Sequence, residues 1–110
     1  MNFDEYQKQA ATTALFTGDD FMDLLHWTLG VGGEAGEITE KIKKIVRDKH
    51  GKLDPSDKED LMKEVGDVLW YLAVLSQHLG YDFSEVAQAN LDKLQSRQAR
   101  GKIGGSGDNR

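Results

Sequence analysis

The segment E-V-G-D-V-L-W-Y-L-A-V-L, residues 64–75, decides the fold. Apolar residues continue on both sides of it at spacings of three and four, which is the period of one helix face. Residues 68–75 are apolar all round, and a helix of that kind must be covered on every side. A chain of 110 residues has few elements that could do this, so we expect a homo-oligomer, either a dimer or a tetramer.

Three further helices are expected on the same grounds, over about residues 3–16, 21–48 and 83–100. Ser56 with Glu59, and Asp82 with Glu85, form capping-box patterns that predict where the third and fourth helices begin. No segment alternates with period two over a useful length. The sequence therefore predicts an all-α fold, a helical bundle of about four helices that oligomerisation completes.

The composition excludes several classes of protein. Without Cys there is no disulfide, no thiolate zinc site and no cysteine nucleophile. No apolar segment approaches the roughly 20 residues that span a bilayer. Residues 1–5 do not resemble a signal peptide, so we expect a cytoplasmic protein with no membrane partner. The net charge of −5 divides into +3 for residues 89–110 and −8 for the rest, and an acidic body disfavours a nucleic-acid duplex as partner.

One acidic motif occurs twice, 30 residues apart, once on each of the two long expected helices. Glu34-Ala-Gly-Glu37-Ile and Glu64-Val-Gly-Asp67-Val share the order acid, small or apolar residue, Gly, acid, branched apolar residue. Acids at positions i and i+3 lie on one helix face about one turn apart. If the two helices pack antiparallel, the two acidic pairs converge.

Carboxylates gathered in one place repel one another, by about 4 kcal/mol for two charges 4 Å apart at an effective dielectric constant near 20. Such a cluster requires either protonation or a cation. Ligation by oxygen alone suits Mg²⁺, Mn²⁺ or Ca²⁺ and not zinc. Taken singly, each motif also fits a solvated helix face with i,i+4 ion pairs, so the repetition carries the metal hypothesis.

Glycines accompany the first motif. Gly30, Gly32, Gly33 and Gly36 lie within seven residues of an expected helix, where each costs roughly 1 kcal/mol relative to Ala. This cost indicates that something occupies the space a side chain would take. The candidates are a closely packed helix and a ligand beside the carboxylates.

These residues resemble the MazG-like all-α nucleoside triphosphate pyrophosphohydrolases, a group that includes dCTP pyrophosphatases. The signature of that family is E-E-x-x-E, a spacer, and E-x-x-D. Glu34-x-x-Glu37 and Glu64-x-x-Asp67 match it with a spacer of 26 residues. Gly33 stands where the family has its first Glu, which leaves the four matched acids unaffected.

The end of the chain is similar to the small, phage-type members of this family. Asn90-x-x-Lys93 is followed by Arg97 and then by residues 101–110, four of which are Gly. On this resemblance residues 1–100 form the pyrophosphohydrolase domain. Residues 101–110 form a flexible tail that can close over the phosphates of a substrate.

The resemblance implies Mg²⁺-dependent hydrolysis of a nucleoside triphosphate, ribo or deoxy, to the monophosphate and pyrophosphate, with Mn²⁺ as a possible substitute. This would be house-cleaning of the nucleotide pool. The residues expected both to bind the metal and to act in catalysis are Glu34, Glu37, Glu64 and Asp67. The candidates for the substrate phosphates are Lys43, Lys44, Lys93, Arg97, Arg100 and Arg110. The large aromatic residues Trp27 and Trp70 are candidates for contact with the base, although a Trp in an apolar stripe more often packs in a core or an interface.

A second interpretation stays open at this point. The chain could be a non-catalytic helical module that dimerises or binds a partner through its apolar third helix and keeps a relic of an acidic cluster. Gly33 and the bundle-like apolar stripes favour this alternative, whereas the paired motifs favour the enzyme.

Overall fold

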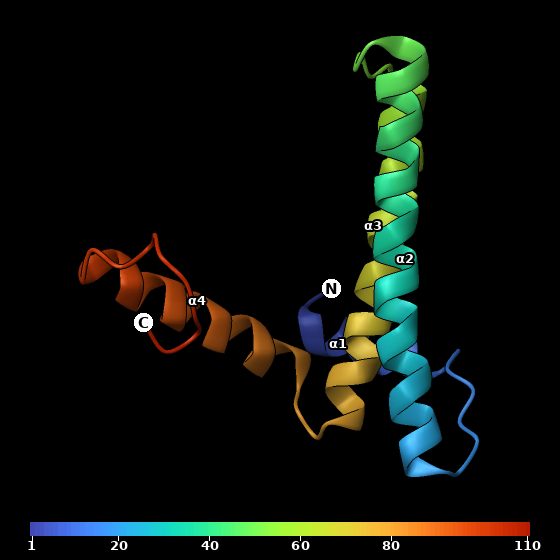
Figure 1. Cartoon of the computed structure of the whole chain (residues 1–110). Helices are drawn as coiled ribbons and strands as arrows, with labels where there is room; N and C mark the ends of the chain where they lie inside the picture. The colour runs from blue at the N-terminus through green and yellow to red at the C-terminus, as the bar shows by residue number, and fades with distance from the viewer.

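The computed structural model describes residues 1–110 and contains four helices and no strand, which confirms the all-α prediction (Figure 1). The helices are α1 (Phe3–Ala11), α2 (Asp20–Lys49), α3 (Pro55–His78) and α4 (Phe83–Ala99). No helix combines the length and the apolarity needed to cross a bilayer.

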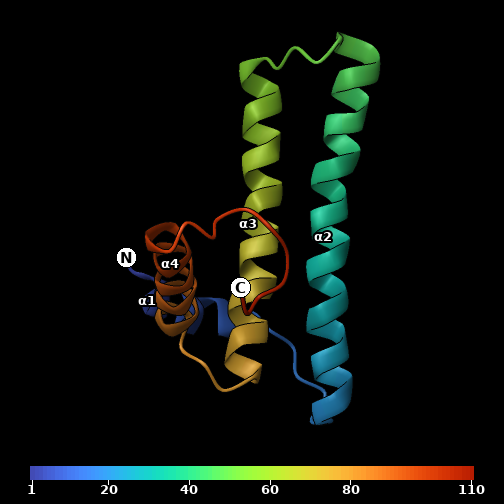
Figure 2. The same cartoon turned by 60° about the vertical axis from the view of Figure 1, so that its left-hand side comes forward.

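The molecule is built on a long hairpin of α2 and α3. The two helices run antiparallel side by side over most of their length, with the short turn between them at one tip (Figures 1 and 2). α1 packs against α3 near the other end of the hairpin. α4 starts beside α1 and then runs away from the hairpin, so the chain has the outline of an L rather than of a closed bundle.

Two helix boundaries differ from the sequence prediction. α1 ends at Ala11 and not near residue 16, because the hydroxyl groups of Thr12 and Thr13 donate to carbonyl oxygens one turn back, which competes with helix continuation. α3 begins at Pro55 with Asp54 as N-cap and Asp57 as its partner, so the Ser56–Glu59 capping box was wrong. At α4 the Glu85 carboxylate accepts from the N–H of Asp82 at 2.8 Å, as expected.

A small core joins α1 and the open end of the hairpin. Its buried residues come from all four helices and are Ala10, Trp27, Ala73, Val74 and Phe83. Gln7 on α1 ties these elements together with its side-chain amide, which donates to the carbonyl oxygens of Ala73 and Tyr81 at 3.1 and 3.0 Å. Its Oε1 accepts from the N–H of Phe83 at 3.0 Å. These bonds hold the start of α4 against α1.

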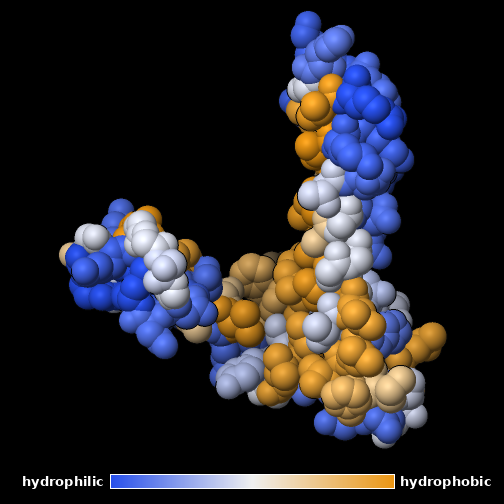
Figure 3. Space-filling view, in the orientation of Figure 1, coloured by the Kyte–Doolittle hydropathy of each residue, from blue (hydrophilic) through white to orange (hydrophobic).

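The helix around residues 68–75 is not covered on every side by its own chain. On α3 and at its C-cap, the side chains of Met62, Val65, Leu72 and Leu79 are exposed and follow one another at helical spacing. Apolar surface lines the inner angle of the L in the space-filling view (Figure 3). The chain therefore leaves open the face that the sequence predicts to be buried.

The surface area measures how open the chain is. Its accessible surface is 7887 Å², whereas a compact monomer of 12.3 kDa exposes about 6,100 Å². Its radius of gyration is 16.9 Å, against about 13 Å for a compact domain of 110 residues. The excess area, about 1,800 Å² per chain, is larger than the roughly 800 Å² that each partner buries in a standard interface.

Gly30 is explained by close helix packing, one of the two expected causes. A Cβ atom at this position would overlap the ring of Tyr71 on α3, whereas a Cβ at Gly32, Gly33 or Gly36 would meet no other part of the chain. The Tyr71 ring cannot move freely, because it lies against the rings of Trp27 and Trp70. Gly30 therefore sets how closely α2 approaches α3.

We predict that Gly30→Ala lowers the free energy of unfolding by about 1–3 kcal/mol, the usual cost of overpacking. Gly32→Ala, two residues further along the same helix, is the matched control and should change stability little or raise it by up to about 1 kcal/mol. Urea unfolding followed by circular dichroism measures both. Equal stability of the Gly30 variant and the wild type would contradict this account of the helix contact.

Candidate metal centre

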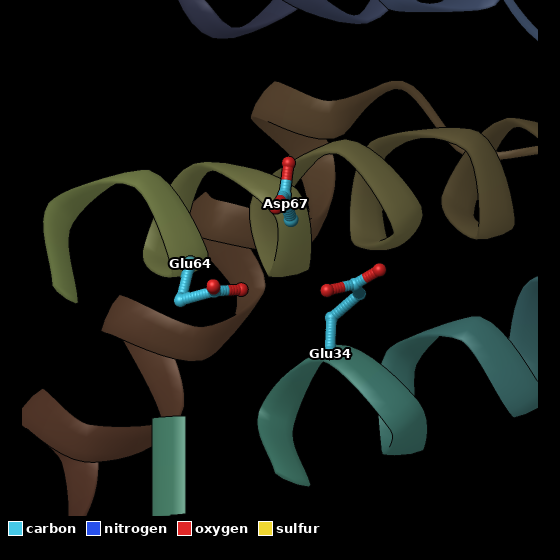
Figure 4. A group of neighbouring side chains, drawn as sticks. All are labelled: Glu34, Glu64 and Asp67. Atoms are coloured by element: carbon cyan, nitrogen blue, oxygen red, sulfur yellow. The ribbon is translucent and has the colours of Figure 1, made fainter. Parts of the chain in front are cut away.

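The hairpin brings three acids of the repeated motif together. Glu34 on α2 and Glu64 and Asp67 on α3 each have a carboxylate oxygen within 4.8 Å of one from each of the others (Figure 4). Glu34 extends from α2 toward α3, opposite the turn of α3 that carries the other two. The two helices pack antiparallel, which is the condition under which the sequence predicts that acids of the two motifs converge.

Glu37, the fourth predicted acid, does not join this group. It is exposed and lies one turn beyond Glu34 toward the hairpin tip. Its negative charge nevertheless contributes to raising the pKa of the Glu34 carboxyl group. The structure therefore gathers three of the four acids, and a ligand role for Glu37 stays a prediction.

Partial burial and neighbouring negative charges raise the pKa values of two groups at the site, Glu34 and Tyr6. Partial burial raises the pKa of Glu34 above its ordinary value, and the charges of Asp67, Glu64 and Glu37 raise it further. Partial burial also raises the pKa of the Tyr6 hydroxyl, and the negative charge of Asp67 adds to this. Ionised carboxylates at this spacing are unfavourable unless a cation balances them.

One basic side chain of the protein lies beside the carboxylates. Lys41 Nζ lies 3.6 Å from Glu64 Oε1. The ammonium group balances part of the charge on the Glu64 side of the cluster, whereas no basic side chain forms an ion pair with Glu34 or Asp67. A hard divalent cation fits the donor set that remains, which consists of carboxylate oxygens alone.

Two residues that lie beside the site, Lys41 and Tyr6, were not predicted from the sequence. Lys41 follows Glu34 by seven residues, which is two helical turns and hence the same face, so its spacing could have revealed it. Tyr6 comes from α1, and its approach to Asp67 depends on how α1 packs against α3. No local pattern of the sequence contains that information.

The predicted phosphate ligands fall in two other regions. Lys43 pairs with Glu40 at 2.9 Å on the exposed side of α2. Lys44 lines a cleft near the hairpin tip, in company with Lys49, Asp48 and Asp57. The remaining four lie on the distal half of α4 or in the segment after it, away from the carboxylates of the same chain (Figure 1). They are Lys93, Arg97, Arg100 and Arg110.

The two tryptophans occupy different environments. Trp27 is only 1% exposed and is enclosed by the rings of Phe16, His26 and Trp70, so it serves as the centre of the core. Trp70 is half-buried, and its Nε1 donates to the Thr13 hydroxyl at 2.9 Å. Of the two, only Trp70 presents part of its ring outside the core, and contact with a base stays a prediction.

The hairpin thus places Glu34 of the E-x-x-E motif opposite both acids of the E-x-x-D motif. The model of the MazG nucleotide pyrophosphohydrolase domain matches residues 23–101, and the chain belongs to this family. It is 49% identical over 114 residues to the "Gene 37 protein" of Mycobacterium phage L5, and the match covers the whole of both chains. No solved structure matches the chain.

The raised pKa of Glu34 gives a stability prediction with a definite sign. A carboxyl group whose pKa is higher in the folded chain costs native stability when it ionises, so the cost is present at neutral pH and absent below the ordinary value of 4.5. In metal-free buffer, Glu34→Gln should therefore raise the melting temperature at pH 7, and the gain should disappear near pH 3.5.

Glu59→Gln is the matched control for this measurement. Glu59 is an exposed acid on α3 whose carboxylate lies 3.7 Å from Lys63 Nζ, and its removal should bring no such gain at pH 7. Melting curves followed by circular dichroism at both pH values, with EDTA present, provide the comparison. A gain from Glu34→Gln that is the same at the two pH values would show that charge repulsion is not its cause.

Proposed function

We propose that this protein hydrolyses a nucleoside triphosphate to the nucleoside monophosphate and pyrophosphate, with Mg²⁺ held by Glu34, Glu64 and Asp67. The observation that carries the proposal is the convergence of these three carboxylates in a chain of the MazG family. Mn²⁺ is chemically similar and should substitute. Glu37, one turn away from Glu34, is the acid available for a second ion or for a metal-bound water.

The donor set supports the choice of metal. Mg²⁺ takes oxygen ligands and is commonly held by one or two carboxylates together with substrate phosphates. When bound, such an ion neutralises phosphate charge and lowers the pKa of a water molecule. The role of Glu34, Glu64 and Asp67 is to fix that charge beside the phosphates, and Lys41 lowers the repulsion around Glu64.

The proposed reaction consumes one water molecule. The water oxygen forms a bond to the α-phosphorus, and the bond between this phosphorus and the oxygen that bridges to the β-phosphate breaks. Pyrophosphate leaves, and the proton from the water passes to a carboxylate of the site. Carboxylates suit this task because they accept a proton within hydrogen-bond reach of the attacking water.

A panel of ribo- and deoxyribonucleoside triphosphates tests the function, with release of pyrophosphate measured in Mg²⁺ and in EDTA. We expect release from at least one triphosphate in Mg²⁺ and none in EDTA. Glu64→Gln and Asp67→Asn keep the shape of the side chain and remove its charge, so each should reduce kcat/KM by about a hundredfold or more. Glu59→Gln on the same helix should leave it unchanged.

Two results of the panel would count against the enzyme. One is wild-type turnover in either variant at saturating Mg²⁺, which would remove the ligand assignment. The other is no release from any triphosphate. The uncovered apolar faces of α3 and α4 would then favour the second candidate function, a non-catalytic module that binds a partner chain.

We also propose that the protein is a homo-oligomer. The excess surface of about 1,800 Å² per chain falls in the range buried by obligate homodimers, which is about 1,000–2,500 Å² for each partner. The exposed side chains that would become buried include Val65 and Leu72 on α3 and Leu91 and Leu94 on α4. A second copy covers such faces because it brings the same apolar surface to the contact.

Multi-angle light scattering at micromolar concentration measures the oligomeric state directly. We expect a mass of at least twice 12.3 kDa that persists on dilution. Val65→Asp places a charge in the uncovered face and should shift the particle toward the monomer. Lys63→Asp is a control with a new charge on a neighbouring exposed position of α3 and should leave the mass unchanged. A stable 12.3 kDa particle from the wild type would refute the proposal.

A further inference from the structure

Residues 101–110 form a loop that folds back on the end of α4. Arg97 is 5% exposed, and its guanidinium donates to the carbonyl oxygens of Gly107 and Asp108 at 3.3 and 2.7 Å. Lys93 Nζ lies 3.2 Å from the Asp108 carboxylate. Two cations of α4 thus fix the far side of the loop.

Arg110 holds the loop from inside. Its Nε donates to the carbonyl oxygens of Lys102 and Gly104, and its two terminal nitrogens donate to those of Ile103 and Gly107. The four distances lie between 2.6 and 3.2 Å. Arg97 and Arg110 are therefore engaged with main-chain oxygens, and both act as positioning residues of the loop.

This arrangement leaves the main-chain N–H groups of the loop free to donate hydrogen bonds to a ligand. The carbonyl oxygens are gathered on the arginines, whereas no N–H from Ile103 to Arg110 donates a hydrogen bond within the chain. Gly101, Gly105 and Gly107 have positive φ angles of 68°, 93° and 86°, which permit this path of the backbone. Successive free amides in a positively charged segment form a setting that binds phosphate-like anions.

The loop is remote from the carboxylates of its own chain. α4 diverges from the hairpin, and we call α4 the arm of the L. The loop lies at the outer end of the arm, across the open angle of the L from α2 and α3 (Figures 1 and 3). The metal centre lies in the middle of the hairpin. Within one chain the site for a cation and the site for an anion are therefore separated.

We propose that the loop 101–110 of one copy binds the outer phosphates of the triphosphate held at the Glu34–Glu64–Asp67 centre of a second copy. This inference rests on the proposed function and adds where the β- and γ-phosphates are bound. The loop amides and the exposed ammonium group of Lys102 contact the phosphates, and Arg97 and Arg110 keep the loop in shape. Each active site is then built from two chains.

The dimensions and the surfaces support a second copy as the occupant of the open angle. From Asp67 to the end of α3 at His78 the helix rises about 16 Å, and α4 with its 17 residues is about 25 Å long. An arm of this length spans the distance from the corner of the L to the level of the carboxylates. Leu91 and Leu94 on the arm and Val65 and Leu72 on the hairpin are exposed apolar groups that such a contact buries.

Charge favours the same pairing. Residues 89–110 carry +3 and the remainder of the chain carries −8, so the basic arm of one copy is attracted to the acidic hairpin of another. In a symmetric pair each arm reaches the other copy, and both centres are completed in the same way.

Mixed dimers test the proposal. Glu64→Gln disables the metal centre, and Arg110→Ala removes the guanidinium that holds the loop while touching no other element. The two chains are co-expressed with different affinity tags, and only dimers that carry both tags are purified. If the loop acts on the other copy, one of the two sites has an intact centre and an intact loop, so at a triphosphate concentration well below the wild-type KM the mixed dimer should show about half of the wild-type rate. If the loop acts on its own chain, the mixed dimer should be slower than the Arg110→Ala dimer at that concentration.

The parent variants set the baseline. The Arg110→Ala dimer should show a KM for the triphosphate raised about tenfold or more with a smaller change in kcat, as expected for loss of phosphate contacts. Its helix content by circular dichroism should equal that of the wild type. Lys58→Ala, which removes an exposed charge on the first turns of α3, is the matched control and should leave KM unchanged.

Binding gives a second readout that does not depend on turnover. Calorimetric titration with inorganic triphosphate should show about tenfold weaker binding to Arg110→Ala than to the wild type or to Lys58→Ala. A mixed dimer no more active than its parents, or Arg110→Ala with wild-type KM and wild-type affinity for triphosphate, would overturn the proposal. Failure of the proposed function is seen separately, as no pyrophosphate release by the wild type itself.

Discussion

The close contact between α2 and α3 at Gly30 and Tyr71 sets the register on which the candidate site depends. Without a side chain at Gly30, the Tyr71 ring lies directly against α2 and is held there by Trp27 and Trp70. Glu34 is one turn further along α2, and Asp67 is one turn before Tyr71 on α3. Because the helices are antiparallel, a contact fixed at Gly30 and Tyr71 places these two acids opposite each other.

The same packing creates an electrostatic cost. Folding brings three carboxylates within 4.8 Å of one another, and the pKa of Glu34 rises because of partial burial and of the neighbouring negative charges. Groups arranged at a cost in the free protein are candidates for binding a ligand that removes that cost. In a chain of the MazG family this ligand is proposed to be Mg²⁺ with a nucleoside triphosphate. The open L shape extends the same argument to a second chain, which would cover the apolar faces.

The long helices and the convergence of acids from both could be predicted from the sequence, because local residue patterns encode them. Helical spacing predicted the long α2 and α3, and the repeated motif predicted that acids from both would converge. Features set by tertiary packing could not be predicted. The approach of Tyr6 to Asp67 depends on where α1 docks, and the separation of Glu37 from the other acids depends on the register of the hairpin. The early end of α1 came from two Thr side chains that bond back to the backbone.

The central claim is that folding builds a divalent-metal site from Glu34, Glu64 and Asp67, and metal-dependent stability tests it most directly. Melting curves of the wild type and of the Glu34→Gln/Glu64→Gln double variant are recorded in EDTA, in MgCl₂ and in NaCl of equal ionic strength. An ion that binds only the folded chain adds about 2.7 kcal/mol at a hundredfold excess over Kd, a rise in the melting temperature on the order of 10 °C. The account predicts this rise for the wild type in MgCl₂ alone and little change for the double variant. An equal response of the two proteins to MgCl₂ would contradict it.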